Sequence, residues 1–298
     1  MANSINSKLQ NNIISQSALE AFATILSPLQ GFSTSFNDEA ARRGSTINVT
    51  TLSATSDVAD FTGTYASQDT TYGTTQISLD QHKFVTWHVT DTEQSESSAV
   101  ELERFGYQKG AELAKAVYQN ILAEVTNANY STAGFSGAAS GFDSDDVADL
   151  RADAINNGLP VEQCALVLSP DYFAALLKDG DIAGYFDYGS ADIVRGGRIP
   201  SLFGIGYVQE SAGIPGNSEN LVGFIAHPSA MAVAMRYLEP TNTSGYIAAR
   251  RLYDDETGMV MGYREFYEES TGTQTAVLEC VWGKKVAVAG GLTRITSA

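Results

Sequence analysis

The residues that first suggest chemistry are the glycines of the run GGRIPSLFGIGYVQES, residues 196–211, because they resemble a phosphate-binding loop. A dinucleotide-binding loop needs glycines at its first, third and sixth positions, between a strand and a helix, so that backbone amides can approach a pyrophosphate. Gly204 and Gly206 satisfy the first two positions, but Gln209 stands where the third glycine should be. A Walker loop needs Gly-Lys followed by Ser or Thr, and this run contains no such sequence. The spacing therefore excludes both motifs.

The histidines and carboxylates do not form a convincing catalytic or metal-binding set either. His82 and His88 would share one face of a strand but lie about 20 Å apart at about 3.3 Å per residue, and His227 before Pro228 is interpreted as structural. The carboxylate clusters, such as 143–149, are typical of helix starts and turns. The sequence has no Gly-x-Ser-x-Gly nucleophile elbow. We predict no catalytic residue, no cofactor, no metal site and no enzymatic activity.

Composition narrows the class of protein further. The 298 residues are 43% hydrophobic, enough for a packed core, and the formal net charge of −17 argues against a nucleic-acid reader. Cys164 and Cys280 stand in apolar runs, which predicts buried free thiols in an intracellular protein. The sequence shows no signal-peptide-like run and no stretch of about 18 apolar residues that could cross a membrane.

The first third of the chain predicts an arm followed by a long hairpin. Residues 1–45 form the arm, with one short helix whose start is suggested by the capping-box spacing of Ser17 and Glu20. Residues 46–96 form the hairpin from the runs STINVTTLS and TQISLDQHKFVTWHVTD. The second run alternates apolar and polar residues, which indicates a strand with one wet face. Two strands are marginal alone in water, so we expect the hairpin to need a neighbouring surface.

The remaining sequence predicts a helix, a mixed module and a returning sheet. Residues 97–130 carry apolar residues at helical spacing, and Gly106 with Gly110 weaken this helix unless they permit a close approach by another element. Residues 131–238 alternate helices and strands, and residues 239–298 form antiparallel strands with a turn at Gly258. The predicted fold class is α+β.

This order of elements resembles the major capsid protein of tailed double-stranded DNA bacteriophages, the Hong Kong 97 type. The runs LVLSPDYFAALLKDGDIAGYFDYGSADIVRGGRIPSLFGIGYVQES and LVGFIAHPSAMAVA look like the axial domain of that family. The resemblance implies an N-arm, an extended E-loop hairpin, a peripheral domain with a long spine helix and an antiparallel sheet, and an axial α/β domain. It covers essentially the whole chain and rests on arrangement more than on any single motif.

The resemblance implies a structural protein that assembles with itself into hexamers and pentamers of an icosahedral head, put together in the host cytoplasm and enclosing double-stranded DNA without sequence-specific binding. It also implies a portal, a separate scaffolding protein because the arm begins near Met1, and a decoration protein as a further partner. Some members of the family form a covalent cross-link between a hairpin lysine and an asparagine of a partner subunit. Such a cross-link is not expected here, since Lys83 is the hairpin's only lysine and lies near its base. We expect inter-subunit contacts at aromatic residues of the hairpin and at paired arginines, namely Arg42, Arg43, Phe61, Tyr65, Tyr72, Trp87, Arg195 and Arg198.

Three alternatives remain open from the sequence. An encapsulin-type shell has the same architecture but encloses an enzyme cargo. A small α/β enzyme would use the alternating module to bind a ligand at strand ends, although it lacks a catalytic constellation. A secreted adhesin would fit the Ser and Thr content, but not the absence of a signal peptide.

Overall fold

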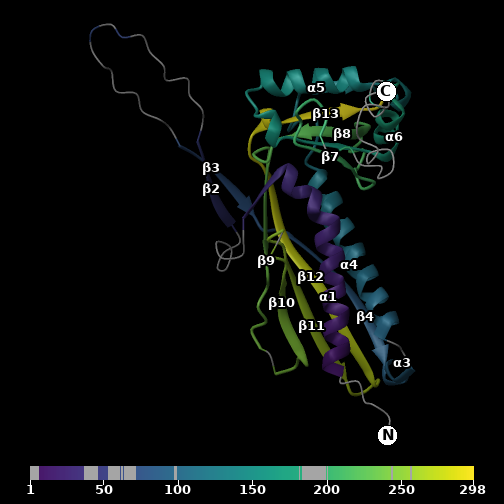
Figure 1. Cartoon of the computed structure of the whole chain (residues 1–298). Helices are drawn as coiled ribbons and strands as arrows, with labels where there is room; N and C mark the ends of the chain where they lie inside the picture. The colour runs from purple at the N-terminus through teal and green to yellow at the C-terminus, as the bar shows by residue number, and fades with distance from the viewer. Residues whose placement is uncertain are drawn as a thin grey trace.

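The computed structural model describes residues 7–36, 46–52, 61, 63, 72–96, 99–180, 182, 199, 201–242, 244–255 and 257–298. Helices and strands contribute comparably, which confirms the α+β class. Figure 1 shows an elongated lower unit built from two long helices on a sheet, a smaller upper unit at one end, and the hairpin of β2 and β3 projecting away from both.

Two helices lie side by side along the lower unit: α1 (Ser7–Leu26) and α4 (Ala99–Leu122) (Figure 1). The apolar side chains of α4 recur every three or four residues, and Leu113, Val117 and Ile121 are buried against the sheet and α1. Short elements continue these helices, namely η1 (Ser27–Gly31) after α1 and α3 (Asp91–Glu96) before α4. The long helix predicted from the sequence is thus confirmed, ending at Leu122.

A six-stranded sheet supports these helices. Its strands are β1 (Ser33–Phe36), β4 (Gln81–Thr90), β9 (Met231–Arg236), β10 (Ala248–Tyr253), β11 (Val260–Glu268) and β12 (Thr273–Val286). The order is β1-β9-β12-β11-β10, and β4 pairs antiparallel with β12 from Gln81↔Trp282 to Thr90↔Thr273. Ala276, Leu278, Cys280 and Trp282 alternate along β12 and enter the core shared with the helices. The helices therefore cover one face of this sheet.

The upper unit contains a five-stranded sheet in the order β5-β13-β8-β6-β7. The strands are β5 (Ala133–Ser136), β6 (Ala165–Leu168), β7 (Tyr207–Glu210), β8 (Leu221–Ala226) and β13 (Leu292–Thr296). Two helices, α5 (Ser144–Asn156) and α6 (Pro170–Lys178), pack on one face around Leu150, Phe173 and Leu176. Asp143 caps α5 as predicted, because its carboxylate accepts from the amides of Asp145 and Asp146 at 3.1 and 3.2 Å.

Several boundaries differ from those predicted. Helix α1 is longer than expected and is packed into the core, and Ser17 does not cap it but lies buried within it, where its hydroxyl donates to the Glu103 carbonyl at 2.6 Å. The hairpin consists of β2 (Thr46–Leu52) and β3 (Tyr72–Ser78), whereas β4 leaves it for the main sheet. Strand β9 belongs to the lower sheet and β13 to the upper one, so the chain crosses between the two units more often than the predicted division allows.

The two cysteines are free and buried, as predicted. Burial raises the pKa of the Cys164 thiol to about 11 and, with a smaller contribution from Glu279, that of Cys280 to about 12. The reactive thiolate is therefore scarce at pH 8. We expect neither thiol to react with a disulfide reagent in the folded subunit and both to react after unfolding in urea, measured by absorbance of the released thiol. Rapid labelling of the folded chain would contradict the burial of these residues.

Among the described residues, no helix combines the length and the apolar character needed to cross a membrane.

Candidate subunit interface

The hairpin of β2 and β3 projects from the body formed by the two larger sheets and their helices (Figure 1). Its strands pair antiparallel from Thr46↔Ser78 to Leu52↔Tyr72 and form a separate two-stranded sheet. Figure 1 shows the hairpin pointing away from both units. A pair of strands has little apolar surface to bury by itself, so an extended hairpin of this kind suits contact with another surface.

The base of the hairpin is held by a small apolar cluster. Ile47, Ile77 and Leu79 pack on Ala232, Ala234 and Val281 of the lower sheet. Gly283 of β12 lets the chain pass directly over the sheet, because an added Cβ would lie 2.8 Å from the carbonyl carbon of Ser78. The direction in which the hairpin leaves the body is therefore fixed by packing at its base.

The predicted contact residues have different positions in the structure. Phe61, in the segment that connects β2 and β3, is 64% exposed. Tyr72 begins β3, but its side chain is outside the described part of the chain, as are Arg42, Arg43, Tyr65, Arg195 and Arg198. Trp87 is only 5% exposed and packs edge to face on Phe105 with ring centroids 5.9 Å apart. It belongs to the core of its own chain, because the apolar face of β4 meets the helices, so it is withdrawn as a contact residue.

The other face of β4 is open. His82, Phe84, Thr86 and His88 alternate along the strand on the side away from the helices, and all four are exposed. Phe84 is the largest apolar group among them, with 62% of its surface accessible. The predicted wet face of this strand is thus confirmed, although the strand lies in the main sheet.

A charged cluster lies beside this open face. Glu279 of β12 is buried, and its carboxylate accepts from Arg264 Nε at 2.7 Å and lies 3.1 Å from His82 Nε2. Burial of the guanidinium opposes its charge, but hydrogen bonding to Tyr246 and attraction to Glu279 outweigh this, so the pKa of Arg264 is raised. The charge on Arg264 is therefore maintained in the folded chain.

Arg264 also contacts the segment that joins β9 to β10. Its Nη2 donates to the Leu238 carbonyl at 3.0 Å, and its guanidinium lies 5.9 Å from the ring centroid of Tyr246. Tyr246 in turn lies edge to face with Phe266. The sequence prediction missed Arg264 and Glu279; the available signal was the presence of charged residues within the largely apolar runs MVMGYREF, which holds Arg264 and Glu265, and TAVLECVW, which holds Glu279.

The upper unit exposes aromatic side chains of its own. Phe203 and Tyr207 are 46% and 57% exposed, at the entrance to β7 and on that edge strand. Phe203 has a φ of 50° and Gly204 a φ of 80°, so these two residues form a tight turn closed by Ile205 N donating to the Leu202 carbonyl at 2.9 Å. Gly204 therefore has a structural role, whereas Gly196 and Gly197 lie outside the described residues.

The described residues offer no set for catalysis or metal binding. They contain no group of three or more His, Cys, Asp or Glu residues that could hold a metal ion. His227 Nδ1 lies 2.8 Å from the Ser229 hydroxyl, and burial lowers the pKa of this histidine, which suits a neutral structural imidazole.

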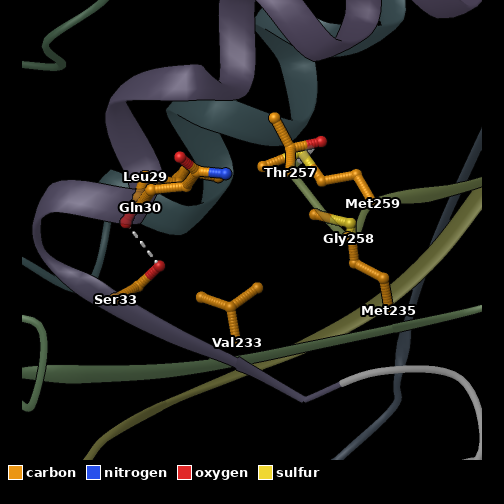
Figure 2. Close-up of a pocket in the computed structure, with 8 residues that line it drawn as sticks. All are labelled: Leu29, Gln30, Ser33, Val233, Met235, Thr257, Gly258 and Met259. Atoms are coloured by element: carbon orange, nitrogen blue, oxygen red, sulfur yellow. Dashed lines mark hydrogen bonds between the residues drawn. The ribbon is translucent and has the colours of Figure 1, made fainter. Parts of the chain in front are cut away.

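A small cavity lies between η1 and the turn that joins β10 to β11 (Figure 2). Its volume of about 20 Å³ is far below the roughly 300 Å³ of an ordinary ligand pocket. Ser33, on its wall, donates its hydroxyl to the Leu29 carbonyl at 2.7 Å, as Figure 2 shows, and so is already satisfied. The cavity has space for about one water molecule and is not a substrate site.

No protein-family model and no curated protein sequence matches the chain. Solved structures do match it. The chain is similar to the capsid structure of the cyanophage P-SCSP1u, with a TM-score of 0.62, 14% identity, and coverage of 89% of this chain and 86% of the other. It is similar to the mature capsid of bacteriophage PhiM1, with a TM-score of 0.59, 13% identity, and coverage of 91% and 86%. A virus-like particle from Pyrococcus furiosus matches with a TM-score of 0.55, 12% identity, and coverage of 95% and 97%.

These likenesses extend over nearly the full length of both partners in each comparison. At this level of identity they establish a shared fold. The chain shares the fold of these capsid structures, as expected from the order of its elements, with two long helices on a sheet, a smaller second unit and a projecting hairpin.

Proposed function

We propose that this chain is the major capsid protein of a tailed double-stranded DNA bacteriophage, and that it assembles with itself into hexamers and pentamers of an icosahedral head. The observation that carries the proposal is the match to two phage capsid structures over 86–91% of all the chains concerned. The projecting hairpin supports it, because a hairpin anchored at its base by a small apolar cluster gains stability by lying on a neighbouring subunit.

The proposed protein works mechanically and has no enzymatic activity or cofactor. Its location is the virion, after assembly in the host cytoplasm. Its partners are further copies of itself, a separate scaffolding protein, a portal and a decoration protein. The net charge of −17 suits a container for DNA, since a shell rich in carboxylates does not hold the phosphate backbone of its genome tightly. The proposed inter-subunit contacts are Phe61 and Tyr72 on the hairpin, Tyr65 between them in sequence, and the arginine pairs Arg42 with Arg43 and Arg195 with Arg198.

Assembly tests this proposal directly. The expressed chain, alone and together with a candidate scaffolding protein, is examined by electron microscopy and analytical ultracentrifugation. Closed shells, tubes, or rings of five or six subunits are expected. A chain that stays monomeric under all assembly conditions, with and without the scaffolding protein, would contradict the proposal.

An encapsulin-type shell is the second candidate, and the likeness to the virus-like particle from Pyrococcus furiosus favours it. The contents of native particles separate the two functions. Double-stranded DNA inside purified particles supports the phage head, whereas a co-purifying enzyme and no genome supports the cargo shell.

A further inference from the structure

The upper and lower units meet through a buried arginine. Arg294 of β13 is 5% exposed and lies on the face of the upper sheet turned toward the end of α4. Its Nε donates to the Tyr130 carbonyl at 2.7 Å, its Nη1 to Glu219 at 2.9 Å, and its Nη2 to the Asn127 side-chain oxygen at 2.8 Å. All three nitrogens of the guanidinium therefore donate hydrogen bonds.

The partners of Arg294 come from both units. Asn127 and Tyr130 follow α4, whereas Glu219 precedes β8 of the upper sheet. Glu219 also accepts from the backbone amide of Asn127 at 2.7 Å, which closes the network. The Arg294 clamp, as we call Arg294 with Asn127, Tyr130 and Glu219, thus joins the segment that follows the long helix to β13 and to the turn before β8 of the upper sheet.

A second contact fixes the same end of α4. The side-chain amide of Asn217 donates to the carbonyls of Leu122 and Val125 at 2.9 and 2.7 Å, and so adds a second hydrogen bond to the Leu122 carbonyl, which also accepts from the Val125 amide at 3.0 Å. Asn217 has a φ of 50°, in the left-handed region that asparagine tolerates better than most residues. The turn that carries Glu219 is thereby held against the helix.

The rest of the junction is apolar. Phe32 of the lower unit meets Phe224 of β8 edge to face, with ring centroids 5.0 Å apart, and Leu221 and Leu292 belong to the same core as the helices. Apolar contact holds the two units together but is non-directional. The hydrogen bonds of Arg294 are directional, since the planar guanidinium presents its donors in a fixed fork.

Because the apolar contacts are non-directional and the hydrogen bonds of Arg294 are directional, we infer that the Arg294 clamp sets the angle between the upper and lower units. This angle in turn sets the curvature of the assembled shell. The inference rests on the proposed capsid function for its consequence in the particle, but the effect on the angle belongs to the subunit itself. A buried ionic group stabilises little in itself, and selecting one arrangement among similar ones is a role that such groups can have.

Arg294→Met tests the inference, because methionine fills the space without the directional donors. Glu219 loses its ion-pair partner but keeps the hydrogen bond from the Asn127 amide, and its side chain is 31% exposed, so water can solvate it and the subunit should stay folded. We expect the variant to assemble. In electron micrographs the parent should form shells of a single diameter, whereas the variant should form particles of several diameters, including open or tubular forms. Arg151→Met, an exposed arginine on α5, removes the same charge and should leave the diameters unchanged.

Arg294→Lys tests whether the positive charge is sufficient or the planar geometry of the guanidinium is needed. Lysine keeps the charge opposite Glu219 but cannot reach Asn127 and Tyr130 in one plane. We expect mixed diameters again, and uniform shells from this variant would overturn the role of the fork. If Arg294→Met fails to fold, Glu219→Gln replaces it, since that change keeps the shape and weakens only one arm of the clamp.

The unassembled subunit distinguishes failure of this inference from failure of the proposed function. Small-angle scattering of Arg294→Met should show a changed distance distribution, and hydrogen exchange at residues 127–130 should become faster. Unchanged scattering and exchange, or shells with the parental diameter, would overturn the inference. A parent chain that forms no shells would contradict the capsid function, while the scattering comparison would still decide the role of the clamp.

Discussion

Alanine at Gly110 is expected to lower the free energy of unfolding of the subunit by about 3 kcal/mol. In an ordinary helix interior the same change stabilises by about 1 kcal/mol, since alanine has the higher helix propensity. The expected sign is opposite here because of α1. A Cβ at Gly110 would lie 2.7 Å from the Cα of Ala18 and closer still to its carbonyl oxygen.

The same close approach recurs one turn earlier. A Cβ at Gly106 would lie 2.9 Å from the Cα of Ile14. These neighbours are backbone atoms, which cannot move aside as a flexible side chain can, so α1 and α4 must separate along their contact (Figure 1). Separation would open space around Phe22 and Leu113, both of which are almost fully buried between the helices and the sheet.

Urea unfolding of the unassembled subunit, followed by circular dichroism, measures the effect. Gly216→Ala is the matched control, since an added Cβ there meets nothing within 4 Å. The control should stay within about 0.5 kcal/mol of the parent. A Gly110→Ala variant with a higher urea midpoint than the parent would mean that α1 does not pack on α4 as described.

Patterns that are local in sequence predicted their elements correctly. The carboxylate cluster 143–149 predicted the start of α5, and Gly258, with a φ of 69°, forms the predicted turn between β10 and β11. Gly106 and Gly110 in the long helix suggested a close approach by another element, and the structure shows that this element is α1. Each of these signals is complete within about a dozen residues, so no distant partner is needed to interpret it.

Features that depend on distant partners were not predicted. The capping-box spacing at Ser17 is a local pattern, but burial of this residue against α4 at Glu103 decides its environment. The break between β3 and β4 exists because Gln81–Thr90 pairs with β12, almost 200 residues away. Alternation along β4 identified an apolar face containing Trp87 without showing that helices of the same chain cover it. Arg294 stands alone in the run GLTRI, and only the fold brings its partners together.

Replacement of residues 53–71 by Asn-Gly is expected to abolish closed shells and leave the subunit folded. Leu52 and Tyr72 are opposite each other in the register of β2 and β3, so a two-residue turn can join them. Asn-Gly favours the type I′ turn whose twist matches such a hairpin. The base cluster of Ile47, Ile77 and Leu79 is untouched, so the urea midpoint should be close to that of the parent.

The expected loss of assembly follows from where the removed segment lies. It contains Phe61, whose ring is 64% exposed in the single subunit, so burial of this apolar surface against a second copy is the stabilisation that the variant forfeits. A variant in which residues 53–71 become a Gly-Ser linker of equal length keeps the length of the segment but removes its side-chain contacts. It therefore tests which of the two is needed for assembly. It should fail to form shells as well, and Phe61→Ser alone should weaken assembly, all measured by sedimentation and electron microscopy. Normal shells from the Asn-Gly variant would show that the hairpin does not join subunits, and the shell would then have to be held by the bodies of the two units alone.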